Sequence, residues 1–378
     1  MEVTVSSLGR FHAFELARQL DKRGHLESFF TGYPFWKVEN DLRPKTKTFP
    51  WLLVPQMAAA RYSLKFSDYL NYPATVTFDH WVAANLPDSD VFAFMSQFGL
   101  KSVGTAKKRG IKIVCMRGSA HILEQDDILK EEFIRHKIPY NGIEKWAIHR
   151  ELAEYDASDL IEVISTFARN TFVKHGIAQE KLYLNPLGVD LSMFHPVEKT
   201  DDVFRVLYVG AMSLQKGVAY VLQALSYLEL PNFEIVFVGS MLDEIKPTFS
   251  LFDGTFKYLG LKSRADLYKY YSDASVFILP SLQDGFGAVL AQAMACRVPV
   301  IATTNSGGPD LITDGVEGFI IPIRDPEAIR DRVLRLYYDP DLRENMAQAA
   351  LLRVQSIGGW DDYGRSVMEA YEGLLKNP

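Results

Sequence analysis

The stretch DGFGAVLAQAM, residues 284–294, has the pattern of a strand that passes into a helix. The apolar run SVFILP before it is typical of a buried strand, the two glycines make a turn, and the alanine-rich segment after it favours a helix. Asp284 stands at the turn, and Gln292 follows about two helical turns later on nearly the same side. We therefore expect an acid and an amide together at the edge of a sheet.

Strand and helix patterns alternate along most of the chain, which indicates an α/β fold with parallel sheets covered by helices on both faces. Strand-like runs lie at residues 2–7, 25–30, 91–95 and 111–116 in a first series and at 203–210, 233–239, 275–280 and 298–303 in a second. Between the series, residues 185–202 contain several turn residues and few periodic apolar positions. Since 378 residues exceed one ordinary core, we predict two doubly wound, Rossmann-like domains that face each other across a cleft.

The composition is that of a globular protein, with 48% hydrophobic and 23% charged residues. A net charge of −6 argues against nucleic acid as a partner, because nucleic-acid binding needs a basic face. The two cysteines, Cys115 and Cys296, are expected to be buried thiols in a reducing compartment. The N-terminus lacks a signal-peptide pattern and no apolar run approaches the roughly 20 residues of a membrane span, so we expect a cytoplasmic protein.

Ligands of doubly wound domains bind outside the carboxyl ends of the strands, so the loops there are the candidate sites. The first such loop is SSLGRFHAF, residues 6–14. Gly9 allows a tight turn, the next helix directs its N–H groups toward the cleft, and Arg10 and His12 add donors. The alternative for Gly9 is a strand–helix turn that binds nothing.

The second loop is VGAMSLQKGVAY, residues 209–220, which follows the first strand of the second series. Lys216 and Gly217 stand at the start of its helix, where the helix dipole disfavours a cation. A bound phosphate would reverse that penalty, so we favour a phosphate site over a solvated lysine.

The third loop lies within the opening stretch. The N–H groups of Phe286, Gly287 and Ala288 are expected to be free at a helix start, which makes a second phosphate cradle. In this hypothesis Asp284 accepts hydrogen bonds from sugar hydroxyls, and Gln292 pairs with a ribose diol. The alternative for Asp284 is an ordinary helix N-cap.

Together these loops resemble the family-4 retaining glycosyltransferases of glycosyltransferase group 1, which have the GT-B fold. The strongest match is residues 279–322, which are similar to the acid–seven residues–acid signature of that family and to its AMA-C-x-x-PV and DG-x-x-G segments. VGAMSLQKG (209–217) resembles the diphosphate loop, NPLGVDLSMFHP (185–196) the interdomain segment, and GWDDYGRSVMEAYEGLL (359–375) the final helix. The resemblance covers nearly the whole chain.

The resemblance implies an acceptor-binding domain at residues 1–190, a nucleotide-sugar-binding domain at 191–356, and a C-terminal helix at 357–378 that crosses back to the first domain. The implied reaction transfers a hexosyl group from a nucleoside-diphosphate sugar to an acceptor hydroxyl with retained configuration and without a metal or other cofactor. The implied setting is synthesis of a cell-surface polysaccharide or glycolipid. A nucleotide sugar and a glycan or lipid-linked acceptor are therefore the expected partners.

The resemblance also assigns roles to single residues. The segment CMRGSAHILEQDD (115–127) is similar to the loop that presents a histidine to the donor sugar, which implies this role for His121 and a second donor at Arg117. A helix-start residue without a chemical role is the alternative for His121. The implied catalytic residues are His121, Asp284 and Lys216. The implied donor-binding residues are Gly9, Arg117, Ala211, Lys216, Asp284, Gly285, Phe286, Gly287, Ala288 and Gln292, with Arg10 and His12 on the acceptor side.

Two positions depart from the family pattern. Gln292 replaces the acid that holds the nucleotide ribose, and Ala211 replaces the arginine of the diphosphate loop, which leaves Lys216 as the matching cation. The amide is expected to cost ~1 kcal/mol, or several-fold in affinity, because a charge-assisted hydrogen bond is stronger than a neutral one. These departures keep two alternatives open: a non-catalytic sugar-nucleotide-binding protein and a nucleotide-sugar 2-epimerase.

Residues 33–66 interrupt the alternation of strands and helices. Aromatic residues are interleaved there with six cations against only two acids. Such a segment either rests on the anionic inner surface of a membrane or packs its aromatic side chains on its own domain. The cations are Lys37, Arg43, Lys45, Lys47, Arg61 and Lys65, and the aromatic residues considered are Phe35, Trp36, Phe49 and Trp51.

The triplet Asp88-Ser89-Asp90 has the spelling of a metal-binding D-x-D motif. It precedes the strand-like run 91–95, so it falls at the wrong end of a parallel sheet for a ligand. We therefore expect a turn there and no metal site.

Overall fold

The computed structural model describes residues 1–61 and 69–376. The first domain has strands β1 (Val3–Ser7), β2 (Leu26–Thr31), β3 (Thr46–Thr48), β4 (Val91–Met95), β5 (Lys112–Arg117), β6 (Leu160–Val163) and β7 (Leu182–Leu184). Its helices are α1 (Ala13–Lys22), α2 (Leu53–Arg61), α3 (Asn71–Asn85), α4 (Leu100–Lys108), α5 (Ile122–Arg135), α6 (Lys145–Ala157) and α7 (Thr166–Lys174).

The second domain follows the same alternation of strands and helices. Its strands are β8 (Phe204–Val209), β9 (Phe233–Val238), β10 (Lys257–Tyr258), β11 (Val276–Leu279), β12 (Val300–Thr303) and β13 (Gly318–Ile321). Its helices are α8 (Val218–Leu225), α9 (Lys246–Leu251), α10 (Leu267–Ser272), α11 (Ala288–Ala295), α12 (Gly308–Leu311), α13 (Pro326–Tyr338) and α14 (Pro340–Ser356), and the chain ends with α15 (Gly359–Lys376).

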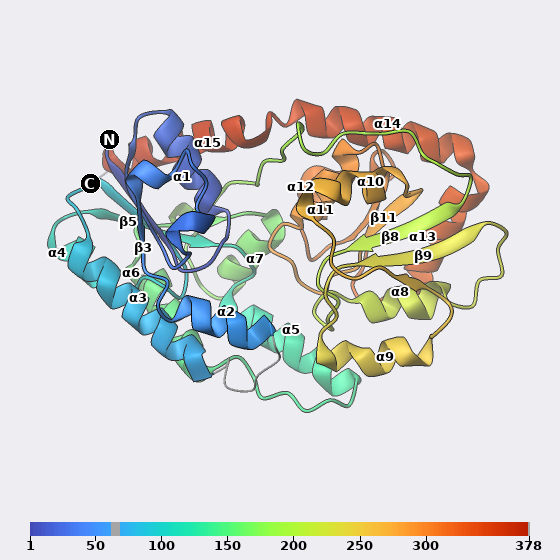
Figure 1. The fold of residues 1–378 in the computed structure, drawn as a ribbon, viewed down its shortest axis with the longest axis horizontal. Helices are drawn as coiled ribbons and strands as arrows, with labels where there is room; N and C mark the ends of the chain where they lie inside the picture. Colours follow the sequence, from blue (N-terminus) through green and yellow to red (C-terminus); the bar gives the residue numbers. More distant parts are fainter. Residues whose placement is uncertain (62–68, 377–378) are drawn as a thin grey trace.

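Each domain contains one parallel sheet, and the two sheets lie beside each other with helices around both (Figure 1). The strand order is β3-β2-β1-β4-β5-β6-β7 in the first sheet and β10-β9-β8-β11-β12-β13 in the second. In both sheets the order reverses at the first strand, so β1 and β8 each stand at a topological switch point. The two doubly wound domains predicted from the sequence are confirmed. Ligands are therefore expected at the carboxyl ends of β1, β4, β8 and β11.

The central strands consist of side chains that are buried on both faces of the sheet. All five residues of β1 and β4, and all four of β11 and β12, are buried. Helices on both faces exclude water from these strands, which explains why they are continuous apolar or small runs and not alternating ones. The polar groups that remain at the surface of each sheet are thus concentrated in the loops at the strand ends.

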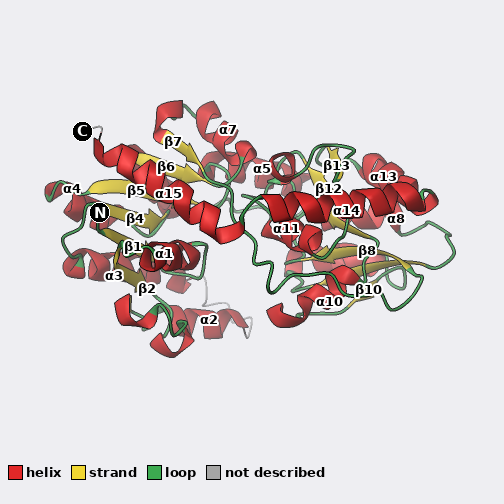
Figure 2. Ribbon diagram, turned by 90° about the horizontal axis from the view of Figure 1, so that it is seen from above, coloured by secondary structure: helices red, strands yellow, loops and turns green. Residues whose placement is uncertain are grey.

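The last two helices connect the domains. α14 and α15 run one after the other along one side of the molecule, with α14 on the second domain and α15 on the first (Figure 2). Tyr363, Val367 and Tyr371 of α15 are buried in the apolar cluster between the first sheet and α1. Lys22 of α1 also forms an ion pair with Asp361 at 2.7 Å. The chain therefore closes on its own N-terminal domain.

The linking segment between the sheets runs from the end of β7 at Leu184 to the start of β8 at Phe204. The predicted domain boundary at residues 190–191 falls in this segment and stays a prediction. Within the described residues, no helix is long and apolar enough to cross a membrane.

Candidate active site

The loops at the carboxyl ends of β5 and β11 touch across the two domains. A methyl group added to Gly285 would lie 2.1 Å from the carbonyl oxygen of Gly118, so only a glycine fits at this contact. Beside it, the Ser119 hydroxyl donates to Gln283 Oε1 at 2.9 Å. The predicted third loop of the second domain is therefore in direct contact with the loop that follows β5.

Lys216 and Asp284 meet in this region. Lys216 Nζ lies 2.5 Å from Asp284 Oδ2, and the side chains are 25% and 16% exposed. Gly217 brings the lysine loop over the end of β11, because it has a φ of +64° and a Cβ there would lie 2.1 Å from the Pro280 carbonyl oxygen. The structure thus joins two residues that are 68 positions apart in the sequence into one half-buried pair of opposite charges.

The start of α11 lies next to this pair. Gly287 has a left-handed φ of +73° and turns the chain into the helix. Within the described residues, the N–H groups of Phe286, Gly287 and Ala288 donate to no acceptor. Phe286 is 1% exposed and its carbonyl accepts from the Gly307 N–H at 2.9 Å, which fixes the turn. Unpaired N–H groups at a helix start, with a lysine beside them, make a place where an anion binds favourably.

Gln292 and Ala211, the two departures from the family pattern, also lie in the second domain. Gln292 Oε1 accepts from the hydroxyl of the fully buried Tyr271 at 3.0 Å. Among the described residues its NH₂ group has no acceptor, so this group remains for a ligand. Ala211 is exposed, and its carbonyl accepts from the Tyr208 hydroxyl at 2.8 Å. Of these two residues, neither brings a charge to the site.

The loop after β1 places its three predicted residues differently. The Gly9 carbonyl accepts from the Ser7 hydroxyl at 2.8 Å, which closes the turn. Arg10 pairs with Glu39 and lies over the Phe14 ring, so its charge is already neutralised. His12 lies beside Gly118, whose side chain would begin 3.8 Å from His12 Cε1. Burial lowers the pKa of His12 to about 4, and its buried Nε2 has no partner among the described residues.

Arg117 is turned into the first domain and away from the donor position implied for it. It is 8% exposed and forms an ion pair with Glu151 at 2.7 Å. Its other nitrogens donate to the Ala120 carbonyl at 3.0 Å and to Gln125 Oε1 at 2.8 Å. The guanidinium fork is thus occupied by the loop 117–121 and by the helices behind it. Arg117 shapes the loop that reaches Gly285 and has no group left for a donor.

His121 is also placed inside the first domain, and this corrects its implied position at the donor sugar. It is 2% exposed, caps α5 by accepting from the Leu123 N–H at 3.3 Å, and stacks on His175 at 4.5 Å between ring centroids. The cavity beside the ring, about 270 Å³, is lined only by first-domain residues. Burial, with the neighbouring cations His175 and Arg117, lowers the pKa of His121 to about 4.

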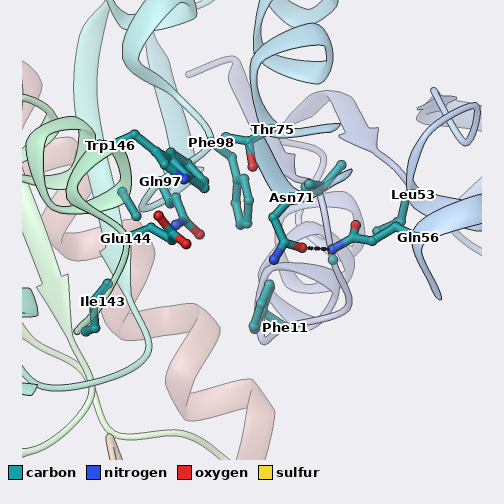
Figure 3. Close-up of a pocket in the computed structure, with 13 residues that line it drawn as sticks. Phe11, Leu53, Gln56, Asn71, Thr75, Gln97, Phe98, Ile143, Glu144 and Trp146 are labelled. Carbon is teal, nitrogen blue, oxygen red and sulfur yellow. Dashed lines mark hydrogen bonds between the residues drawn. The ribbon is translucent and has the colours of Figure 1, made fainter. Parts of the chain in front are cut away.

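A larger cavity adjoins Gly9, and the sequence gave no sign of it (Figure 3). Its volume is about 360 Å³, and its walls come from the loops after β1 and β4 and from α2, α3 and α6. Aromatic side chains Phe11, Phe98 and Trp146 line it together with amide and carboxylate groups. These residues belong to separate segments of the chain with no common motif, which is why inspection of the sequence missed them.

The predicted turn at residues 88–90 lies at the amino end of β4. Asp90 Oδ2 accepts from the Glu2 N–H at 2.7 Å, and Asp88 lies 3.7 Å from Arg109. The search of the described residues finds no group of three or more His, Cys, Asp or Glu side chains that could hold a metal ion.

The basic aromatic segment shows both arrangements considered for it. Phe49 stacks on Trp81 of its own domain at 5.1 Å, whereas Trp36 and Trp51 are 72% and 74% exposed. The acids of the segment pair with α1 and the loop before it, since Glu39 binds Arg10 and Asp41 binds Arg18. Lys37, Lys45 and Lys47 then have no carboxylate partner among the described residues, while the Arg61 side chain and Lys65 lie outside them.

Comparison with known families and curated proteins points in one direction. Residues 192–353 match the family model described as "Glycosyl transferases group 1". The putative colanic acid biosynthesis glycosyltransferase WcaL of Escherichia coli is 25% identical over 64% of this chain and 60% of its own length. The amylovoran biosynthesis glycosyltransferase AmsK of Erwinia amylovora is 24% identical over 68% of this chain and 63% of its own. The chain thus matches about three fifths of the length of these relatives.

Solved structures match over the whole chain. Sucrose-phosphate synthase from Thermosynechococcus elongatus superposes with a TM-score of 0.71 at 17% identity, covering 100% of both chains. Anabaena HepE, solved in complex with UDP, superposes with a TM-score of 0.70 at 14% identity over 99% of this chain and 100% of its own. These likenesses confirm the predicted GT-B architecture of two facing Rossmann-like domains.

Proposed function

Residues 192–353 belong to the glycosyltransferase group 1 family, and from this premise we propose that the chain is a retaining glycosyltransferase. It moves a hexosyl group from a nucleoside-diphosphate sugar to an acceptor hydroxyl. The observation that carries the proposal is the half-buried Lys216–Asp284 pair beside the free N–H groups at the start of α11. The names of relatives that make colanic acid and amylovoran support an acceptor in polysaccharide or glycolipid synthesis.

The site is suited to stabilising a leaving diphosphate. As the bond between the sugar and the diphosphate breaks, negative charge grows on the phosphate oxygens, and preorganised donors lower the barrier. Lys216 Nζ and the N–H groups of residues 286–288 are these donors. Asp284 holds the lysine until the diphosphate arrives, and then accepts from hydroxyls of the sugar or faces its positive charge.

The first domain contributes a neutral group on the other side of the cleft. We assign this place to His12, because it lies beside Gly118 and its Nε2 is unpaired among the described residues. With a pKa of about 4 the imidazole is uncharged at neutral pH, so it can exchange hydrogen bonds with an acceptor or sugar hydroxyl. His121 has no part in this step, since its ring is enclosed by first-domain side chains.

The reaction is tested by incubating the protein with nucleoside-diphosphate sugars and a panel of glycan acceptors, and by following the anomeric proton of the product with NMR. We expect release of the nucleoside diphosphate and a product with the anomeric configuration of the donor. A product of inverted configuration would contradict the retaining mechanism. We also expect full activity in excess chelator, since Lys216 supplies the cation; a loss that added Mg²⁺ restores would contradict metal independence.

A non-catalytic nucleotide-sugar-binding protein is the second candidate. It is favoured by the missing charge at Ala211 and by the attachment of Gln292 to Tyr271. This candidate predicts nucleotide binding without turnover for every acceptor in the panel. Interconversion of the donor into its 2-epimer without transfer would instead indicate the epimerase alternative.

We propose further that residues 33–66 contact an anionic membrane surface. The exposed indoles of Trp36 and Trp51 and the unneutralised Lys37, Lys45 and Lys47 have the composition of an interfacial segment. Sedimentation with vesicles of phosphatidylglycerol and phosphatidylcholine tests this. We expect binding that falls with added salt and is at least about fivefold weaker for the variant carrying both Trp36→Ala and Trp51→Ala; equal binding of that variant would rule the contact out.

A further inference from the structure

The cavity of about 360 Å³ beside Gly9 lies at the ligand edge of the first sheet (Figure 3). Gly9 and Phe11 follow β1, and Gln97 and Phe98 follow β4, so the cavity opens at the carboxyl ends of two adjacent strands. The next strand in the sheet, β5, ends in the loop whose Gly118 touches Gly285. Since neighbouring strands are about 5 Å apart, the cavity lies about 5–10 Å along the edge from the cleft contact.

Aromatic rings form part of the wall of the cavity. Phe11 is 47% exposed and stacks with Phe98 at 6.4 Å between centroids and 30° between planes. Trp146 is held by Tyr72, whose ring meets it edge-on at 5.2 Å. The negative face of an aromatic ring attracts the weakly positive C–H groups of a ligand. Two separate aromatic surfaces, Phe11–Phe98 and Trp146, are thus offered to a ligand with C–H faces.

Polar groups complete the lining. Gln56 Nε2 donates to Asn71 Oδ1, while Gln56 Oε1 is buried without a partner among the described residues. Glu144 is exposed and forms no ion pair within the described residues. Figure 3 places Gln97 and Glu144 next to Trp146, and the Gln56–Asn71 pair on the other side of the cavity. Amide and carboxylate groups therefore stand on both sides of the aromatic surfaces.

This combination excludes two other classes of ligand. An alkyl chain would bury Gln56 Oε1 and the Asn71 amide against hydrocarbon, and a polar group buried without a hydrogen bond costs at least about 1–3 kcal/mol. An anion such as phosphate finds no lysine, arginine or histidine in the lining, and it is repelled by Glu144. A ligand with apolar C–H faces and a rim of uncharged hydroxyls matches every part of the wall.

We propose that this cavity binds an uncharged sugar ring of the acceptor, stacked on Phe11 or Trp146 and hydrogen-bonded by Gln56 and Glu144. The proposal rests on the proposed transferase function for the word acceptor, whereas sugar binding by the cavity can be tested without any transfer. A sugar seated here lies close enough to the cleft for its hydroxyl, or that of the adjoining residue of the same glycan, to reach the donor.

Ligand-detected NMR with the full chain and no nucleotide tests the proposal. The probes are methyl glycosides of glucose, galactose, mannose and N-acetylglucosamine, with decanol and inorganic phosphate as the competing classes. We expect saturation transfer to at least one glycoside, with an affinity at least about fivefold weaker for Phe11→Ala and for Trp146→Ala, which is the size of a lost aromatic contact. Tyr338→Ala, which removes an equally exposed aromatic side chain from α13, serves as the matched control and is expected to change nothing.

The outcomes separate this proposal from the transferase function. Glycoside binding that needs Phe11 and Trp146 supports the cavity even when no transfer is detected. Binding of decanol or phosphate in place of every glycoside overturns it, as does equal glycoside binding by the wild type and both variants. Phe11 lies in a loop and is half exposed, so its variant keeps the test valid even where Trp146→Ala does not fold.

Discussion

The ligand edges of the two domains are built in opposite ways. On the second domain, two short loops bring together Lys216, Asp284 and the free N–H groups of α11, all next to glycines that the backbone requires. On the first domain, the cavity beside Gly9 is assembled from five segments and offers rings and amides without a cation. The difference indicates that one edge suits a constant, charged group and the other a variable, uncharged one.

The contact between the edges gives the largest expected effect. Gly285→Ala places a methyl group 2.1 Å from the Gly118 carbonyl oxygen, so the two loops must separate. Because a misplacement of about 1 Å at a reacting centre can cost about 100-fold, we expect turnover to fall about 100-fold. Nucleotide affinity, which depends on the second domain alone, is expected to stay within about threefold.

Steady-state kinetics and calorimetry on the same preparation measure both quantities. Gly104→Ala is the matched control, since nothing lies within 4 Å of the added methyl group. Unchanged turnover in Gly285→Ala would mean that the two edges do not meet during catalysis.

The charged edge is tested by Lys216→Ala. Loss of the cation that faces the diphosphate is expected to lower turnover at least about tenfold, and Asp284→Asn to do the same by loosening the pair. The control is Lys269→Ala, which breaks an ion pair of the same domain with Asp266 at 2.9 Å on the surface. Wild-type rates in both site variants would remove this edge from the mechanism.

A smaller effect is expected at Gln292. Gln292→Glu keeps the bond from the Tyr271 hydroxyl and adds a charge that strengthens a bond from a ribose hydroxyl. We expect a several-fold gain in affinity for the preferred nucleoside diphosphate, measured by calorimetry. An unchanged or weaker affinity would show that residue 292 does not face the ribose.

The smallest effect on turnover is expected at His121, which tests whether the interior of the first domain takes part in chemistry. Its folded pKa is about 4 and its unfolded value about 6.5, so only the unfolded chain binds a proton between these values. Wild-type stability is therefore complete above pH 6.5 and falls as the pH drops toward 4.

His121→Gln removes this proton linkage together with the stacking on His175. Urea unfolding should find the variant less stable at pH 7 and the gap to wild type narrower at pH 5, with turnover at pH 7 within about twofold. A turnover loss of tenfold or more would restore the catalytic role implied by the family resemblance.

The sequence predicted the architecture well because its signals are local. The central strands are uninterrupted apolar runs, and the turn glycines Gly217 and Gly287 mark where two of them pass into helices. Short strands at or near the sheet edges were missed: β3 has three residues and β10 has two, too few for a pattern. The prediction also brought Lys216 and Asp284 to one edge, where the structure pairs them.

The first-domain side chains were harder to predict. A loop histidine at the end of a strand can point to the cleft or into the domain, and packing against Tyr155, Phe172 and His175 decided the direction for His121. The acid that neutralises Arg117, Glu151, lies 34 positions away on α6. Such choices depend on tertiary neighbours that no local pattern contains.

The central claim is that the charged edge of the second domain binds a nucleoside diphosphate through Lys216. Thermal unfolding of the wild type and of Lys216→Ala against UDP, GDP, ADP, TDP and CDP tests it most directly. A ligand at 100 times its dissociation constant adds about 2.7 kcal/mol, so we predict that one nucleotide raises the wild-type midpoint by about 5–10 °C and leaves the variant nearly unmoved. No shift of the wild type with any nucleotide at millimolar concentration, or an equal shift of both proteins, would contradict the account.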